Sequence, residues 1–213
     1  MSSPDQSLRR VNALGEDHLR DYKINVIKTS KYTLVTFLPK NLIEQFSKLA
    51  NVYFLLITFM QMIPIISISG GKPVMLLPLL FVIGVSMIKD IFEDFKRHRS
   101  DKAENFKEVS VYDKISKEFV KQHWKDVKVG QLVKIHCDEF FPADMVFMQS
   151  SERKGICYVE TKNLDGETNL KHKLAEKCLH ERLNNYDIED AVAGHIVCEM
   201  PNDQIYKFEG TYY

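Results

Sequence analysis

The chain has 213 residues, enough for one or two domains. Lysine plus arginine and aspartate plus glutamate both number 29, so the formal net charge is zero and argues against a nucleic-acid partner, which needs a basic surplus. The four cysteines form no Cys-x-x-Cys pair, which favours free cytosolic thiols over a zinc site.

The first 20 residues, "MSSPDQSLRRVNALGEDHLR", contain no apolar core of a signal peptide. This stretch predicts a polar, mobile tail without a cleaved leader.

Two apolar runs without charge follow. The first, residues 49–71, has 23 residues, more than the roughly 20 that a helix needs to cross a bilayer. The second, residues 73–88, has 16 and covers only about 24 Å as a helix, so we expect it to continue into "KDIFEDF" with Lys89 reaching the membrane interface. The short "GGK" between them predicts a transmembrane helical hairpin; the alternative is a buried hairpin of a soluble protein.

The basic residues around the hairpin give its orientation. Those before it are Arg20, Lys23, Lys28, Lys31, Lys40 and Lys48; those after it are Lys89, Lys96, Arg97, Arg99, Lys102 and Lys107; the turn has Lys72 alone. The positive-inside rule therefore places both termini in the cytosol and the turn at 70–73 outside it.

The segment "PKNLIEQFSKLAN" before the first run predicts an interfacial helix with Leu42, Ile43, Phe46 and Ala50 on one face. Within the first run, the amide of Gln61 must find a partner. It faces other helices or a wet groove, either as helix-to-helix contact or as a contact to substrate.

From about residue 109 the pattern changes to short strands. We expect strands within 109–120, 127–137, 142–151, 155–164, 194–201 and 205–213, with a helical stretch within 169–192. Many short strands with turn signals are typical of a small β-sandwich or jelly roll. The chain stops inside an apparent strand, so we expect this domain to be incomplete at its C-terminus.

Between a strand and a lysine lies "DGET", Asp165 to Thr168. Asp-Gly is a common turn dipeptide, because glycine adopts a positive φ without steric cost. The residues alone leave open whether this is only a turn or a loop that carries chemistry.

Over residues 25–210 the sequence resembles the N-terminal part of a P-type ATPase of the phospholipid flippase branch. The resemblance rests on "KYTLVTFLPKNLIEQFSKLANVYFLL", "MIPIIS", "PLLFVIGVSMIKDIFEDFKRHRSD", "PAD" and "CYVETKNLDGETNLK". DGET is the flippase signature where other P-type pumps have TGES. Gln131 departs from the family's usual Asp, and Met62 stands where members that transport phosphatidylserine have a second Gln.

The resemblance implies a fold: a membrane α-helical hairpin plus a cytosolic all-β actuator domain, a distorted jelly roll. It divides the chain into an N-terminal cytosolic segment (1–40), an interfacial helix with two transmembrane helices (41–95) and a truncated actuator domain (96–213). It also implies that Glu167 is the general base that hydrolyses an aspartyl-phosphate, with Gly166 allowing close approach and Asp165 and Thr168 shaping the loop.

For function, the resemblance implies an ATP-driven flippase that moves phospholipid from the exoplasmic to the cytosolic leaflet. Gln61, Met62 and Pro64 would contact the lipid. ATP and Mg²⁺ would serve the complete enzyme, and an accessory β-subunit would be a partner.

The chain has no Asp-Lys-Thr-Gly-Thr motif, so we expect it to be inactive alone. Alternatives are a non-catalytic short membrane isoform that binds flippase partners, and an ion pump, which DGET and the span sequences disfavour.

Overall fold

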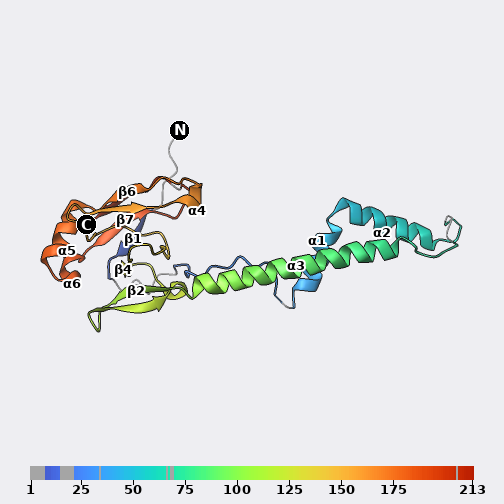
Figure 1. Ribbon diagram of the computed structural model, residues 1–213, viewed down its shortest axis with the longest axis horizontal. Helices are drawn as coiled ribbons and strands as arrows, with labels where there is room; N and C mark the ends of the chain where they lie inside the picture. Colours follow the sequence, from blue (N-terminus) through green and yellow to red (C-terminus); the bar gives the residue numbers. More distant parts are fainter. Residues whose placement is uncertain (1–7, 15–21, 34, 66, 68–69, 205) are drawn as a thin grey trace. The chain divides into compact units, whose positions relative to one another are not determined.

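The computed structural model describes residues 8–14, 22–33, 35–65, 67, 70–204 and 206–213 (Figure 1). The chain divides into two compact units. A helical unit comprises Ile27–Asn105, and a β unit combines Met1–Val26 with Phe106–Tyr213.

The helical unit contains α1 (Phe37–Phe46), α2 (Leu49–Met62) and α3 (Leu76–Asn105), and α2 lies alongside the first part of α3 (Figure 1). The expected continuation of the second apolar run into the charged stretch is confirmed, since α3 runs through both. Helix α2 is shorter than the apolar run from which it was predicted, because Ile63 already has an extended backbone. The proline that follows Ile63 disfavours helical geometry at that position.

Among the residues that the structure describes, no helix combines the length and the apolar character needed to cross a membrane. Helix α2 has 14 residues, and the 30 residues of α3 include the charged "KDIFEDFKRHRSDKAEN". The predicted pair of membrane spans is therefore not confirmed by the structure.

Helix α1 packs against the rest of its unit through polar side chains. Asn41 and Gln45 are fully buried, whereas Ile43 is 72% exposed. The side-chain amides of Asn41 and Gln45 donate to the same carboxylate oxygen of Asp90 in α3, at 2.7 and 3.1 Å. Because a buried amide needs a partner, this shared acceptor decides which face of α1 turns inward. That the apolar face of this helix meets a membrane interface stays a prediction.

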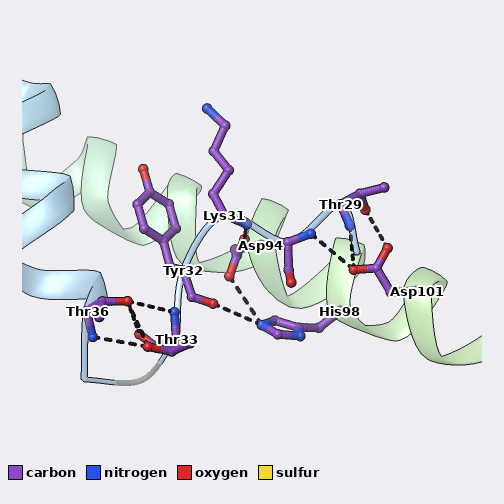
Figure 2. Close-up of polar contacts among 9 residues, drawn as sticks. Thr29, Lys31, Tyr32, Thr33, Thr36, Asp94, His98 and Asp101 are labelled. Atoms are coloured by element: carbon purple, nitrogen blue, oxygen red, sulfur yellow. Dashed lines mark hydrogen bonds and ion pairs between the residues drawn. The ribbon is translucent and has the colours of Figure 1, made fainter. Parts of the chain in front are cut away.

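Residues 29–32 have no regular secondary structure and lie along α3, where Asp101 supplies acceptors for them (Figure 2). One carboxylate oxygen of Asp101 accepts the backbone N–H groups of Thr29 (2.9 Å) and Ser30 (3.0 Å), and the other accepts the Thr29 hydroxyl at 2.5 Å. These bonds satisfy backbone N–H groups that would be paired with carbonyl oxygens in a strand or helix.

Two more side chains of α3 extend the same attachment. Asp94 accepts the backbone N–H of Lys31 at 2.8 Å, and the ring N–H of His98 donates to the carbonyl oxygen of Tyr32 at 3.1 Å (Figure 2). Asp94 and His98 are four residues apart, so they lie on one face of the helix. The segment is thus fixed to α3 through its backbone and through the hydroxyl of Thr29.

In the β unit, the predicted strand-turn-strand after residue 108 is confirmed. Strand β2 (Glu108–Asp113) pairs with β3 (Glu118–His123) and with β4 (Val133–Lys134), in the order β3-β2-β4. Val109, Val111 and Trp124 form the buried core of this part. Trp124 opens the short 3₁₀ helix η2 (Trp124–Asp126) that ends the hairpin.

The remaining strands form two further antiparallel sheets. Strand β5 (Ile156–Val159) pairs with β6 (Lys171–Leu174). Strand β7 (His195–Glu199) lies between β1 (Leu8–Asn12) and β8 (Gly210–Tyr212). The helices α4 (Lys162–Asp165), α5 (Lys177–Asn185) and α6 (Ile188–Ala191) complete this unit.

Antiparallel β-structure is therefore confirmed, but four details of the prediction are wrong. Residues 8–12 are a strand rather than part of a mobile tail; residues 1–7 and 15–20 of that tail lie outside the described part. Residues 142–151 contain no strand, and residues 171–174, expected to be helical, form β6. In the described residues the strands fall into three small sheets with helices between them, rather than into an all-β jelly roll.

The Asp101 attachment predicts a pH-dependent stability. The hydrogen bond from the Thr29 hydroxyl is the main cause that lowers the pKa of Asp101, with the Thr29 and Ser30 amides adding to it. A carboxyl group whose pKa is lower in the folded state stabilises the fold at pH values above its unfolded-state pKa of about 4. This stabilisation is lost as the pH falls through the folded-state pKa. We expect Asp101→Asn to lower the thermal unfolding midpoint at pH 7, and the difference from the wild type to narrow below about pH 4.

The control is Lys102→Met, an exposed neighbour in α3, which we expect to leave the midpoint nearly unchanged at both pH values. A difference between wild type and Asp101→Asn that stayed constant from pH 7 to pH 3 would contradict this assignment.

Candidate functional site at the DGET loop

The DGET residues lie between β5 and β6. The single turn of α4 ends at Asp165, and Gly166 follows with φ +76°, closing the turn by donating its N–H to the carbonyl of Lys162 at 3.0 Å. The prediction of a turn at this place is confirmed. A Cβ added to Gly166 would meet no atom within 4 Å, so its glycine requirement comes from the backbone angle and the space beside it is open.

The carboxylate of Asp165 is almost fully enclosed, with its side chain 6% exposed. It accepts hydrogen bonds from the hydroxyl of Thr161 (3.0 and 3.1 Å), the backbone N–H of Glu167 (2.9 Å), the ammonium of Lys171 (2.5 Å) and the hydroxyl of Tyr206 (3.3 Å). A carboxylate with so many donors has little capacity left for a ligand. Asp165 therefore shapes the loop.

Glu167 is placed differently. Its side chain is 53% exposed, and its described ion pair is with Lys171, at 2.8 Å. Thr168 is exposed as well. The loop thus presents one accessible carboxylate beside an enclosed one.

Three charges meet in this loop. The hydrogen bond from Lys171 is the first cause that lowers the pKa of Asp165, followed by the bond from the Glu167 amide. The same contacts raise the pKa of Lys171, through Asp165 first and then Glu167. Lys171 and Asp165 are therefore both charged near neutral pH. Among the described residues, no group of three or more His, Cys, Asp or Glu side chains is arranged to hold a metal ion.

The other predicted residues belong to the helical unit. The side-chain oxygen of Gln61 accepts the backbone N–H of Met75 at 3.1 Å, just before α3 begins. Met62 is the last residue of α2 and is 56% exposed; Pro64 is exposed in the turn beyond it. Gln61 thus has a protein partner, as a polar side chain in an apolar helix requires.

Sequence reasoning missed the partners of Asp165. Thr161 precedes Asp165 by four residues, a spacing that brings side chains together once α4 forms, so its contact had a local signal. Lys171 was seen only as the end of a motif, because its contacts depend on how β6 returns beside the loop. Tyr206 had no signal, since it is 41 positions from Asp165.

The ion pair between Lys171 and Asp165 can be tested through the side-chain carboxyl carbon of Asp165, whose resonance reports on the charge of that carboxylate. In the wild type we expect this resonance not to titrate between pH 4 and pH 8. In Lys171→Met its titration midpoint should rise, because the main cause of the lowered pKa of Asp165 is removed. Two-dimensional NMR across a pH series provides the measurement.

Lys173→Met is the matched control, because Lys173 is an exposed lysine of the same strand. Equal midpoints in wild type and Lys171→Met would show that the ammonium does not set the charge state of Asp165.

Comparison with known proteins places this chain in a family. Residues 9–74 match the family described as phospholipid-translocating ATPase N-terminal. Phospholipid-transporting ATPase VB of Homo sapiens is 43% identical over 195 residues, covering 92% of this chain and 13% of that protein. Phospholipid-transporting ATPase VA of Homo sapiens is 40% identical over 194 residues, covering 91% of this chain and 12% of that protein.

A plant relative agrees with the human ones. Phospholipid-transporting ATPase 1 of Arabidopsis thaliana is 39% identical over 211 residues, covering 99% of this chain and 17% of that protein. The chain therefore spans less than a fifth of the length of these relatives, while the relatives span nearly all of the chain. With this agreement over both compact units, the chain belongs to the phospholipid flippase family of P-type ATPases and corresponds to its N-terminal part.

Proposed function

We propose that this chain supplies the dephosphorylation loop of an ATP-driven phospholipid flippase, with Glu167 as the general base. The observation that carries the proposal is the contrast between the two acids of the loop. Asp165 is enclosed and surrounded by donors, whereas Glu167, the residue after Gly166, is half-exposed. One acid is therefore architectural and the other is free to approach a reacting group.

The reaction is the hydrolysis of an aspartyl-phosphate formed elsewhere in the complete enzyme. Glu167 accepts a proton from a water molecule while the water oxygen attacks phosphorus and the phosphorus–oxygen bond to the aspartate breaks. The products are inorganic phosphate and a free aspartate, and the proton resides on Glu167 until it is released to solvent. ATP and Mg²⁺ serve the complete enzyme by supplying and neutralising the phosphoryl group.

Close approach of a carboxylate to a phosphoryl group is opposed by like charge. Contact is therefore governed by movement of the loop's domain toward the phosphoryl group and not by resting affinity. Gly166 suits such a docking role, because the space where a side chain would project is empty. Thr168, also exposed, offers a hydroxyl donor next to Glu167.

The helical unit supports a membrane role. Large apolar side chains are exposed along α2 and α3, among them Leu49 (84%), Leu77 (75%) and Phe81 (72%). Exposed apolar surface of this kind is typical of contact with lipid or with further helices. We place α2 and the first part of α3 in the membrane, with both termini cytosolic, which corresponds to the division into residues 1–40, 41–95 and 96–213.

In this arrangement the transported phospholipid moves from the exoplasmic to the cytosolic leaflet. Gln61, Met62 and Pro64, at the end of α2, contact it, and the accessory β-subunit is the protein partner. The competing proposal is a non-catalytic isoform that binds the same partners. The two proposals differ in whether Glu167 takes part in dephosphorylation, which substitution of Glu167 tests.

The test of Glu167 uses a chimera in which these 213 residues replace the aligned segment of phospholipid-transporting ATPase VB. In Glu167→Gln the phosphoenzyme should form normally from radiolabelled ATP, because phosphorylation does not use this loop. Its decay in a chase should slow by about 10²- to 10⁴-fold, or roughly 3 to 5 kcal/mol of barrier, because the water has lost its base.

Glu160→Gln is the control, since Glu160 is an exposed acid on the same connection between β5 and α4. Decay of the Glu167→Gln phosphoenzyme at the wild-type rate would leave DGET as a turn without chemistry.

A second experiment concerns Gln61 in the same chimera. Gln61→Glu keeps an acceptor for the Met75 N–H but loses the amide donor, whereas Gln61→Ala loses both. If the amide contacts lipid, both variants should change the preference among phosphatidylserine, phosphatidylethanolamine and phosphatidylcholine. Unchanged preference, with lower thermal stability in Gln61→Ala alone, would make Gln61 a contact between α2 and the start of α3.

A further inference from the structure

Lys171 is the one residue that contacts both acids of the DGET loop in the part of the chain that the structure describes. Its ammonium lies 2.5 Å from Asp165 and 2.8 Å from Glu167, and it also sits over the ring of Tyr206, 4.9 Å from the centroid. The side chain is 27% exposed, so the ammonium is sheltered without being sealed from solvent.

The two contacts of this ammonium are unequal. Asp165 is enclosed, and three further groups hold it in place, so its contact with Lys171 is sheltered from solvent on the side of the carboxylate. Glu167 is half-exposed, and its carboxylate can rotate away into solvent. Lys171 thus has one sheltered contact, with Asp165, and one contact that can exchange, with Glu167.

We propose that Lys171 is a further catalytic residue, whose ammonium makes the DGET loop able to approach a phosphoryl group. The inference rests on the function proposed for Glu167. In the resting loop the ammonium neutralises one of the two carboxylates and holds the other in place. When the phosphoryl group arrives, the ammonium exchanges Glu167 for a phosphoryl oxygen, and the carboxylate is released beside the water it must deprotonate.

Charge and geometry both favour this exchange. A phosphoryl oxygen carries more negative charge than a carboxylate oxygen and binds a lysine ammonium well. The ring of Tyr206 faces the ammonium, and the hydroxyl of Tyr206 donates to Asp165, so Tyr206 keeps the cation beside Asp165 during the exchange. Without Lys171, two unneutralised acids would meet the phosphate together.

The experiment compares Lys171→Met, Lys171→Gln and Lys171→Arg with Glu167→Gln in the chimera described above. Both neutral variants should form phosphoenzyme at the wild-type rate and lose it about 10²-fold more slowly, the scale expected when one preorganised donor to a developing charge is lost. Lys171→Arg keeps the charge with a different geometry and should recover part of the decay rate.

A second readout is inhibition by orthovanadate, which mimics the phosphoryl group. The neutral Lys171 variants should bind vanadate at least about tenfold more weakly, because a cation that contacts it is gone, whereas Glu167→Gln should bind it as well as or better than the wild type. If Lys171 were only structural, the vanadate affinities of the neutral Lys171 variants and of Glu167→Gln would not change in opposite directions. Lys173→Met is the control and should match the wild type in decay and in vanadate inhibition.

The outcomes separate the two proposals. Normal decay in Glu167→Gln would overturn the function proposed for the loop. Slow decay in Glu167→Gln together with normal decay and vanadate affinity in either neutral Lys171 variant would overturn the role of Lys171 alone. Failure of all three Lys171 variants to form phosphoenzyme would also overturn it, in favour of an ion pair needed only for folding.

Discussion

Backbone N–H groups outside helices and strands need acceptors, and in this chain aspartate side chains provide many of them. Asp101 and Asp94 hold residues 29–31 on α3, and Asp165 accepts the amide of Glu167 at the DGET turn. Asp113 does the same for Ser116 in the β2–β3 turn. The aspartate side chain is short, so it can accept only from backbone N–H groups that lie close to it in space. Each of these bonds therefore restricts the path that the bonded backbone can take. The irregular segments depend on this constraint for their shape.

The same constraint explains why the two acids of the loop differ so strongly. Asp165 lies where α4 ends and donors converge from Thr161, Lys171 and the following backbone. Glu167 is one residue beyond the positive-φ glycine, where the chain leaves the turn and its side chain faces solvent. A change of two positions in sequence therefore converts a structural carboxylate into an accessible one. Chemical identity alone does not distinguish them.

Local patterns in the sequence predicted local structure well. The β2–β3 hairpin, the helix that continues past the second apolar run and the turn at Gly166 all follow from residues within a few positions of one another. Pairings between distant segments were not predictable, because strand alternation carries no information about which partner a strand will find. The pairing of β1 with β7 and the approach of Tyr206 to Asp165 are of this kind.

Polar side chains determine how α1 packs against α3. The sequence pattern puts Ile43 and its apolar neighbours on one face, and the amides of Asn41 and Gln45 turn inward to reach Asp90. An unpaired buried amide costs more than an exposed isoleucine, so the polar contact prevails. Apolar residues are then left on the outer surface, where lipid or other helices can accept them.

The pairing of β1 with β7 also has a consequence for the order of synthesis. Strand β1 leaves the ribosome long before its partner β7, because most of the described residues lie between the two strands. The described contacts that fix residues 27–32 to α3 close within Ile27–Asn105 and can form as soon as that unit has been made. Until β7 emerges, the N-terminal strand is an unpaired edge in the growing chain, and such edges are exposed to mispairing.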